Sequence, residues 1–309
     1  MFLLIHAEHL TVCYGTLRAV DDVSLDVGRK EIFGIVGKNG AGKTTLVETI
    51  EGLKKPQGGK VLIDGIDPFH KAEKARLYKK ISVQLQSTNY PNKARVEELC
   101  GLFSSIYDAP RDYRELLERF DLSSKRRSFF SDLSGGQKQK LSILLALISN
   151  PEVVFFDEIT TGLDAQARHE IWGLLKGLRE EGLTIVLVTH FMDDVEAVCD
   201  RVGVMRDAHM IHVGTQYELL KTAGLLQSVC FTAGGDAVEG LDGMEGVLKV
   251  IKEGDDYRIW GNNDNMASRV IAYLDANGVQ YSGFDTHRPT MEDVFLKLTD
   301  SEPKEGVKG

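Results

Sequence analysis

A nine-residue stretch that begins at Gly37 constrains the fold of this chain more than any other feature. It reads Gly-Lys-Asn-Gly-Ala-Gly-Lys-Thr-Thr and fits the pattern G-x-x-x-x-G-K-[ST], the Walker A motif. An apolar, strand-like run (residues 32–36) precedes it, and a helix-like run (residues 45–53) follows it. Because phosphate loops of this kind join a strand to a helix, the context supports the motif and predicts an α/β domain.

The residue types in this loop suit phosphate binding. Glycines allow successive backbone N–H groups to curl around an anion, and a helix that begins near Gly42 directs its positive end toward it. Lys43 can reach the outer phosphates of a nucleotide, and the Thr44 hydroxyl can hold Mg²⁺. We expect the loop to bind a nucleotide through Gly37, Lys38, Asn39, Gly40, Ala41, Gly42, Lys43, Thr44 and Thr45, with Lys43 also acting in catalysis.

Composition and charge narrow the class of protein. The chain has 309 residues, of which 42% are hydrophobic and 27% charged, enough for one large domain or two smaller ones. A net charge of -9 gives no basic surplus for binding nucleic acid. The four cysteines are far apart without metal-ligand spacing, which favours free thiols in a reducing cytosol. No apolar run reaches the roughly 18 residues that a membrane span needs, so a membrane role requires a partner.

The first part of the chain, residues 1–222, has the organisation of one α/β domain. Residues 4–14 and 18–27 alternate like paired antiparallel strands. Continuous apolar runs at 153–157 and 184–189 are typical of buried strands in a parallel sheet. Between 87 and 150 the pattern changes to amphipathic helices, which predicts a helical insertion. Further elements are expected as helices at 71–80, 96–107, 111–120, 134–149 and 165–181, and as short strands at 60–65, 81–86, 201–205 and 210–213.

A second, smaller α+β domain is expected over residues 225–300. Its element order is β-α-β-β-α-β, which suggests a ferredoxin-like sandwich. The polar tail 301–309 is expected to be flexible. The elements of this domain are expected as strands at 228–232, 247–252, 257–260 and 279–284, and as helices at 236–244, 265–276 and 291–298.

Two carboxylates stand directly after the apolar run at 153–156. Asp157, at the strand's end, can hold Mg²⁺, and Glu158 can polarise the water that attacks a γ-phosphate. The alternative interpretation is an ordinary acidic helix start, which the nearby phosphate loop disfavours. A second candidate anion site is Leu133-Ser134-Gly135-Gly136-Gln137, where a serine and two glycines open a helix.

With these motifs in this order, residues 4–214 resemble the ATP-binding cassette (ABC) ATPases. The resemblance implies the fold of a P-loop NTPase cassette, with a mixed sheet core, antiparallel N-terminal strands and a helical insertion. It also implies ATP and Mg²⁺ as ligands. The LSGGQ sequence matches the family's signature, so Ser134, Gly135, Gly136 and Gln137 are expected to close on ATP held by a second cassette.

The resemblance assigns further roles by position. Gln86 matches the Q-loop glutamine, which touches Mg²⁺ or the attacking water, although Gln84 lies on the same strand face and the choice between them stays open. His190 matches the switch histidine that senses the γ-phosphate. Tyr14 matches the aromatic residue that stacks on adenine, and Val20 is assigned to the nucleotide as well.

Other positions extend or depart from the family pattern. Gly162-Leu163-Asp164 matches the D-loop, which crosses the dimer seam. Ile159 stands where the family usually has proline, Lys38 replaces a common proline, and Lys140 replaces a common arginine. None of these replacements removes a catalytic group, so they bear on local rigidity rather than on the reaction.

The C-terminal stretch Pro289–Thr299 resembles the end of ATPases from daunorubicin-resistance-type exporters. The resemblance implies an exporter ATPase whose partners are an integral-membrane permease and a second cassette, in a homodimer. The location it implies is the cytoplasmic face of the cell membrane. An importer ATPase and a soluble ABC ATPase of translation or DNA repair remain alternatives. A P-loop kinase or GTPase would leave the signature unexplained.

Overall fold

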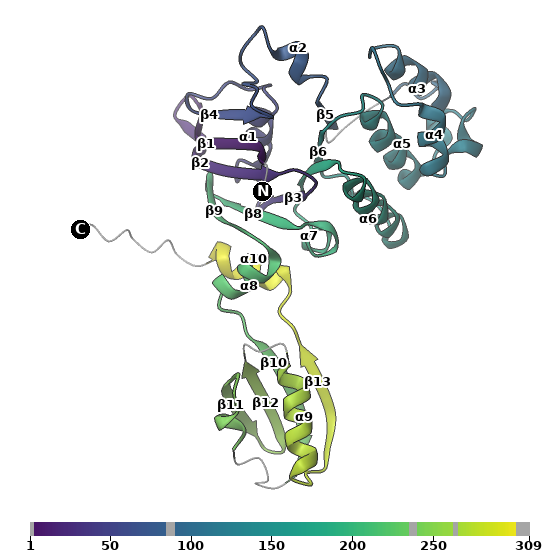
Figure 1. The fold of residues 1–309 in the computed structure, drawn as a ribbon. Helices are drawn as coiled ribbons and strands as arrows, with labels where there is room; N and C mark the ends of the chain where they lie inside the picture. The colour runs from purple at the N-terminus through teal and green to yellow at the C-terminus, as the bar shows by residue number, and fades with distance from the viewer. Residues whose placement is uncertain (1–2, 85–89, 235–239, 262–264, 301–309) are drawn as a thin grey trace. The chain divides into compact units, whose positions relative to one another are not determined.

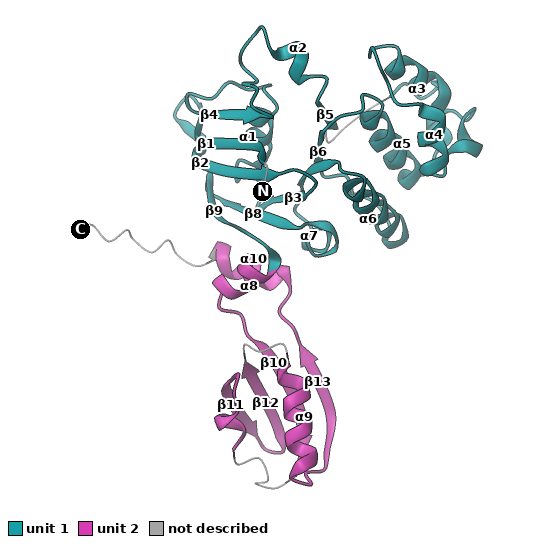
Figure 2. Cartoon of the chain, in the orientation of Figure 1, with its two compact units in different colours: residues 1–216 teal, residues 217–309 magenta. Residues whose placement is uncertain are grey.

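A computed structural model describes residues 3–84, 90–234, 240–261 and 265–300 (Figure 1). The chain forms two compact units, residues 1–216 and 217–309 (Figure 2). The boundary lies before the expected domain end at 222, because helix α8 (Gln216–Thr222) falls almost wholly in the second unit. Across the described ranges, no helix has the length and apolar character needed to cross a bilayer.

The first unit is built on a six-stranded sheet in the order β5-β6-β7-β3-β8-β9. All neighbours run parallel except β9, which is antiparallel to β8. All of β3 and β7 and the first four residues of β6 are buried, as expected for apolar strands covered on both faces. The strands are β3 (Ile32–Gly37), β5 (Ile81–Gln84), β6 (Val153–Asp157), β7 (Thr184–Val188), β8 (Arg201–Arg206) and β9 (His209–Gly214).

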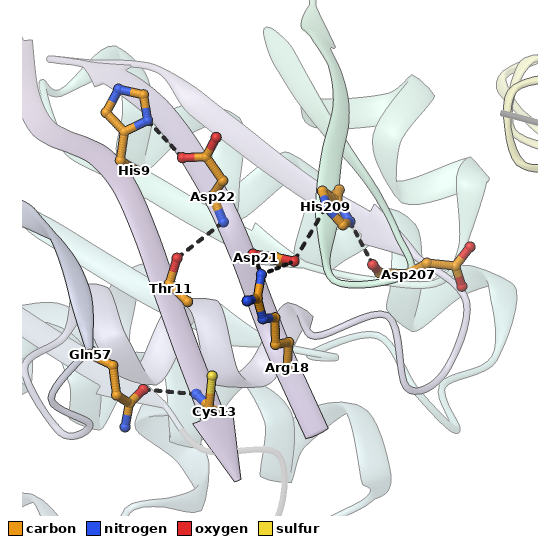
Figure 3. A network of polar contacts seen from close by, with 9 residues as sticks. All are labelled: His9, Thr11, Cys13, Arg18, Asp21, Asp22, Gln57, Asp207 and His209. Carbon is orange, nitrogen blue, oxygen red and sulfur yellow. Dashed lines mark hydrogen bonds and ion pairs between the residues drawn. The ribbon is translucent and has the colours of Figure 1, made fainter. Parts of the chain in front are cut away.

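A three-stranded antiparallel sheet, β2-β1-β4, supplies the other strands of this unit: β1 (Leu3–Tyr14), β2 (Leu17–Gly28) and β4 (Gly58–Ile63). Its inward residues, such as Leu10 and Val23, share one hydrophobic core with β3, β6 and helix α1 (Lys43–Ile50). Figure 3 shows a link between β2 and the start of β9: Asp21, which pairs with Arg18 of its own strand (2.9 Å), lies 3.7 Å from Nε2 of His209. The Asp21 N–H also donates to the carbonyl oxygen of Ala208, in the turn before β9, at 2.9 Å. The antiparallel strands at the N-terminus are therefore fixed to the edge of the larger sheet.

From residue 90 on, where the structure describes it, the helical insertion contains three helices that contact one another and two short 3-10 helices. Its first two helices are shorter than expected, since α3 ends at Ser104 and α4 begins at Tyr113. The basic segment 71–80 forms only the four-residue α2, because Leu77 is its one buried side chain. The remaining elements are α2 (Lys74–Leu77), α3 (Val96–Ser104), α4 (Tyr113–Arg119), η1 (Ser123–Lys125), η2 (Phe130–Asp132), α5 (Gly135–Leu147), α6 (Ala165–Glu180) and α7 (Met192–Val198).

The second unit contains an antiparallel sheet in the order β11-β12-β10-β13, the order of a split β-α-β arrangement. Side chains of β10, β12 and α9 form its core. The first four residues of the helix expected at 236–244 lie outside the described residues, and the described part contains only the 3-10 turn Leu241–Gly243. The elements are β10 (Gln227–Ala233), β11 (Val247–Glu253), β12 (Asp256–Gly261), α9 (Met266–Ala276), β13 (Tyr281–His287) and α10 (Met291–Asp300).

Candidate active site

The strand order brings three separate motifs to one edge of the six-stranded sheet. Strand β7 lies between β6 and β3, and the three strands run parallel. Val188 of β7 is level with Asp157 on one side and with Ile35 on the other. Because parallel strands end at the same edge, the loop after Gly37, the Asp157–Glu158 pair and His190 all emerge together.

Close backbone approaches explain two glycines of the phosphate loop. A Cβ atom on Gly42 would lie 2.0 Å from the carbonyl oxygen of Ala19, and one on Gly37 would lie 2.6 Å from that of Met205. Gly42 also has a φ of 99°, in the left-handed region that favours glycine, and it caps α1. Within the described residues, no acceptor bonds the backbone N–H groups of residues 42–45. These N–H groups are therefore available to an anion at the helix N-terminus.

Lys43 holds its positive charge at the mouth of this loop. Its Nζ donates to the carbonyl oxygens of Gly37 (2.7 Å) and Lys38 (3.2 Å), and its side chain is largely buried. Burial lowers the pKa of Lys43, while the charges of Glu158 and Asp157 oppose the shift. The loop thus presents a constrained ammonium group together with several N–H donors, which suits the outer phosphates of a nucleotide.

Asp157 and Glu158 place two carboxylates next to each other at the end of β6. Burial, followed by the charge of Glu158, raises the pKa of Asp157. A divalent cation would relieve this repulsion, and the Asp157 carboxylate and the Thr44 hydroxyl are oxygen donors of the kind that Mg²⁺ prefers. In the described part of the chain, no cluster of three or more His, Cys, Asp or Glu side chains could hold a metal. Bound Mg²⁺ would therefore also rely on phosphate oxygens and water.

Glu158 is held by the end of the neighbouring strand. Its backbone adopts a φ of 52°, and its N–H donates to the carbonyl oxygen of Val188 at 2.9 Å. The carboxylate lies 2.8 Å from Nδ1 of His190, with the Thr161 hydroxyl at 3.5 Å. Because a carboxylate only accepts, Nδ1 of His190 carries the proton in this contact. This contact holds both side chains in the cavity that the phosphate loop also lines.

An open cavity of about 540 Å³ brings most of the expected nucleotide residues together. Gly37, Lys38 and Ala41 belong to the loop but do not line this cavity, while Leu17 and Ala19 line it unexpectedly. The lining residues are Tyr14, Leu17, Ala19, Asn39, Gly40, Gly42, Lys43, Thr44, Thr45, Asp157, Glu158 and His190.

Val20 corrects one expectation. Its side chain is fully buried in the core, where it pairs with Val12 across the antiparallel sheet, so it does not reach the cavity. The neighbouring Ala19 lines the cavity instead. Successive residues of a strand face opposite sides, so one position decides which side chain meets a ligand.

Tyr14 lines the cavity and is 48% exposed as a residue, which suits stacking on a base. The ammonium of Lys54 lies 3.4 Å from the ring centroid. The N–H of the preceding residue, Cys13, donates to Oε1 of Gln57 at 2.8 Å (Figure 3). This bond ties the end of β1 to the loop that carries Lys54, a residue that the sequence gave no reason to select.

The signature residues line a second, separate cavity, where the sequence predicts an anion site. Ser134 caps α5: its Oγ accepts from the N–H of Gln137 (3.3 Å), and Gln137 Oε1 accepts from the N–H of Ser134 (3.1 Å). Gly135, Gly136 and the D-loop residues 162–164 line the same cavity, which shares no residue with the one around the phosphate loop. Lys140, which replaces the common arginine, forms an ion pair with Glu170 of α6 at 2.8 Å.

The described residues include only one of the two candidate Q-loop glutamines. Gln84 ends β5 level with Phe156 and is buried, and its Oε1 has no hydrogen-bond partner in the part of the chain that the structure describes. Gln86 lies outside the described residues. The assignment of the Q-loop glutamine therefore stays a prediction.

Comparison with known proteins identifies relatives along nearly the whole chain. A model of the ABC transporter family matches residues 20–161. Nod factor export ATP-binding protein I of Cupriavidus pinatubonensis is 34% identical over 94% of this chain and 89% of its own. Daunorubicin resistance ATP-binding protein DrrA3 of Streptomyces coeruleorubidus is 33% identical over 93% and 92%. Methionine import ATP-binding protein MetN 2 of Shouchella clausii is 39% identical over 70% and 67%.

A solved structure is similar to a large part of this chain. It is a dimeric ATP-binding cassette in a post-hydrolysis state, bound to ADP and phosphate. It superposes with a TM-score of 0.60 at 26% sequence identity and covers 68% of this chain and 98% of its own. The similarity therefore extends over nearly the whole of that cassette and about two thirds of this chain.

Proposed function

This chain belongs to the ATP-binding cassette family of transporter ATPases, and from that premise we propose that it powers export through a separate membrane-spanning subunit. Family membership makes it an ATP-binding subunit that uses Mg²⁺ and hydrolyses ATP to ADP and phosphate. It also makes a membrane permease and a second cassette its partners. Beyond family membership, we propose that transport is export, that the chain lies at the cytoplasmic face of the membrane, and that specific residues bind and hydrolyse ATP.

The observation that supports export is the extent of the match to the relatives. Both exporter ATP-binding proteins match across 93–94% of this chain, which includes most of the C-terminal unit. The methionine import protein matches 70% of the chain, despite its higher identity of 39%. That higher identity keeps an importer ATPase as the second candidate.

The site supports a division of roles in ATP hydrolysis. Lys43 and the N–H groups of residues 42–45 would bind the phosphates, and Tyr14 would stack on the base. Thr44 and Asp157 would hold Mg²⁺, which supplies charge neutralisation at the phosphate oxygens when bound. Glu158 would polarise the attacking water, and His190 would orient Glu158 through their 2.8 Å contact.

Two copies of the chain would complete each reaction site. The signature and the phosphate loop line different cavities of the same unit, so each has an open side for a second cassette. In the proposed homodimer, Ser134 and the following glycines of one copy would meet the outer phosphate bound by the other. Separation after hydrolysis would then be transmitted to the permease.

The same proposal places the chain at the cytoplasmic face of the membrane. Because no described helix could span a bilayer, attachment would depend on the permease. Copurification of the tagged chain from detergent-solubilised membranes should recover a protein with many membrane spans. Recovery of the chain alone, or with ribosomes or DNA, would contradict this location and support a soluble role.

The direction of transport can be tested without knowing the cargo. Cells with the Lys43→Ala variant should be compared with wild-type cells by profiling small molecules inside the cells and in the medium. An exporter predicts a compound that is retained inside and depleted outside in the variant. The opposite distribution would indicate an importer.

A further inference from the structure

Asp194 is a buried carboxylate that accepts hydrogen bonds from three different segments of the first unit. It lies in helix α7, and its side chain has no exposed surface. Its Oδ2 accepts from the hydroxyls of Thr160 (2.6 Å) and Thr189 (2.8 Å), and its Oδ1 accepts from Nε1 of Trp172 (2.9 Å). The two threonines are themselves buried, so the cluster is shielded from solvent.

The donors belong to the segments that carry the reacting groups. Thr160 stands two residues after Glu158, and Thr189 directly precedes His190. Trp172 lies in α6, the helix that Asp164 of the D-loop caps by accepting from the N–H of Ala167 at 2.8 Å. One carboxylate therefore joins the loop after β6, the loop after β7 and the helix that follows the D-loop.

The hydrogen-bond directions favour a carboxylate at this position. The Thr189 hydroxyl accepts from the N–H of Phe191 at 3.0 Å while it donates to Asp194. Oδ2 of Asp194 thus receives two hydroxyl donors at once, which only an acceptor can do. An asparagine has only one acceptor oxygen, so its amide nitrogen would face either the two hydroxyls or Nε1 of Trp172, all of which donate here.

A second contact runs between the same segments. The guanidinium of Arg168, on α6, lies 5.1 Å from the centroid of the Phe191 ring. That ring in turn lies 4.0 Å from the imidazole of His190. Two contacts therefore restrain His190. One runs through Thr189, which bonds to Asp194, and the other runs through Phe191, which lies against Arg168 of α6.

We propose that Asp194 is a positioning residue for ATP hydrolysis, which holds the Glu158 and His190 loops in register with the helix after the D-loop. The inference rests on the proposed function, because it takes Glu158 and His190 as the acting pair. Asp194 touches neither substrate nor reacting atoms and acts through Thr160 and Thr189. Through Trp172, a displacement of α6 when a second cassette meets the D-loop would reach the hydrolytic pair.

The test is a double-mutant cycle in the full-length chain with Mg-ATP. Asp194→Asn is measured alone, with His190→Ala and with Thr160→Val, and each variant is assayed for kcat, KM and ATP affinity. Misplacement of reacting groups by about 1 Å can cost about 10²-fold in rate. We expect a loss of kcat approaching that size with unchanged ATP affinity. We also expect a much smaller additional loss in the His190→Ala and Thr160→Val backgrounds.

A matched control separates positioning from general stability. Asp200 is a part-buried carboxylate of the same unit that accepts from the N–H of Ile32 (2.8 Å) and from Arg179 (2.6 Å), and it does not line the nucleotide cavity. Asp200→Asn should leave kcat near the wild-type value even if it lowers the melting temperature. An equal loss of kcat in both variants would overturn the proposal, as would full additivity of Asp194→Asn with both second substitutions.

The cycle also distinguishes this inference from the proposed function. If His190→Ala kept wild-type turnover, the role given to His190 would fail. In that case the cycle of Asp194→Asn with Thr160→Val would alone test the role of Asp194. Losses of kcat that are not additive, with ATP affinity unchanged, would support it. Additive losses in that cycle, or losses that follow ATP affinity, would reject it.

Discussion

The imidazole of His190 donates through Nδ1 to the carboxylate of Glu158 across 2.8 Å. This contact joins the ends of two neighbouring parallel strands, β6 and β7, at the edge of the sheet where the phosphate loop also opens. The Glu158 N–H reinforces it by donating to Val188 of the neighbouring strand at 2.9 Å. Sheet topology, rather than proximity in sequence, thus brings together the carboxylate that we propose polarises the water and the imidazole that we propose orients it.

Replacement of Lys43 by alanine should abolish hydrolysis and weaken ATP binding. The substitution removes the charge that faces the outer phosphates, as well as the bonds from Nζ to the loop carbonyls. The fold should survive, because burial disfavours the charged form of Lys43, as its lowered pKa indicates, and alanine removes that buried charge. Steady-state ATPase assays and isothermal titration with ATP provide the measurement, and near-normal turnover would contradict the phosphate-loop assignment.

The Ser134→Arg substitution tests whether the signature acts on a second copy. It would place bulk at the start of α5, in a cavity separate from the phosphate loop. Hydrolysis should be lost while ATP binding to the single chain is unchanged. Ser131→Arg, on the exposed surface just before the signature, is the matched control and should keep activity. Equal loss of ATP binding in Ser134→Arg would argue against action in trans.

Glu51 should make the stability of the first unit depend on pH. Burial raises the pKa of Glu51 from 4.5 to about 8, with smaller contributions from Glu48 and Asp157. Because the folded-state pKa lies above the unfolded-state value, the Glu51 carboxyl makes its most favourable contribution to the free energy of unfolding below pH 4.5. That contribution is lost as pH rises through about 8, at about 1.4 kcal/mol for each unit of pKa difference.

Chemical denaturation without nucleotide, at pH 5.5 and pH 8.5, measures this effect. Glu51→Gln should raise the free energy of unfolding at pH 8.5 much more than at pH 5.5. Glu118→Gln, at an exposed position on α4, should give the same small change at both values. A pH dependence that is unchanged by Glu51→Gln would show that this carboxyl is not the source.

A chain truncated after Gln216 should still bind ATP. All described residues of the nucleotide cavity lie in the first unit. Gln216 itself contributes to that unit, because its Nε2 donates to the carbonyl oxygens of Val195 (2.9 Å) and Cys199 (3.2 Å). Isothermal titration with ATP checks the prediction, and an insoluble or non-binding product would mean that the two units are not independent.

Sequence reasoning located the groups whose chemistry depends on spacing along the chain. The phosphate loop, the Asp157–Glu158 pair and the Ser134 cap follow from local patterns. The parallel order of β6, β7 and β3 brings the first two together, and Ser134 caps α5 in a separate cavity. The local pattern could not determine whether Ala19 or Val20 of β2 faces the cavity. The pairing of β1 with β2 shifts register near Val12, so the alternation of side chains in β1 does not carry over simply to β2.

Contacts between distant segments were also beyond the sequence. Asp194 looks like an ordinary acidic residue in the first turn of a helix, yet its three donors come from separate segments. Lys54 meets Tyr14 only because the loop after α1 returns to the end of β1. Such roles depend on tertiary packing, and a single sequence carries no signal for them.

The central claim is that two copies close on ATP and that Glu158 drives the hydrolysis that reopens them. Glu158→Gln keeps the size of the side chain but removes the carboxylate, which is worth about 10²–10⁴ in rate for a positioned group. Size-exclusion chromatography with light scattering should then show a dimer that grows with Mg-ATP and disappears without it. A variant that has lost turnover but remains monomeric at saturating Mg-ATP would contradict the two-copy mechanism.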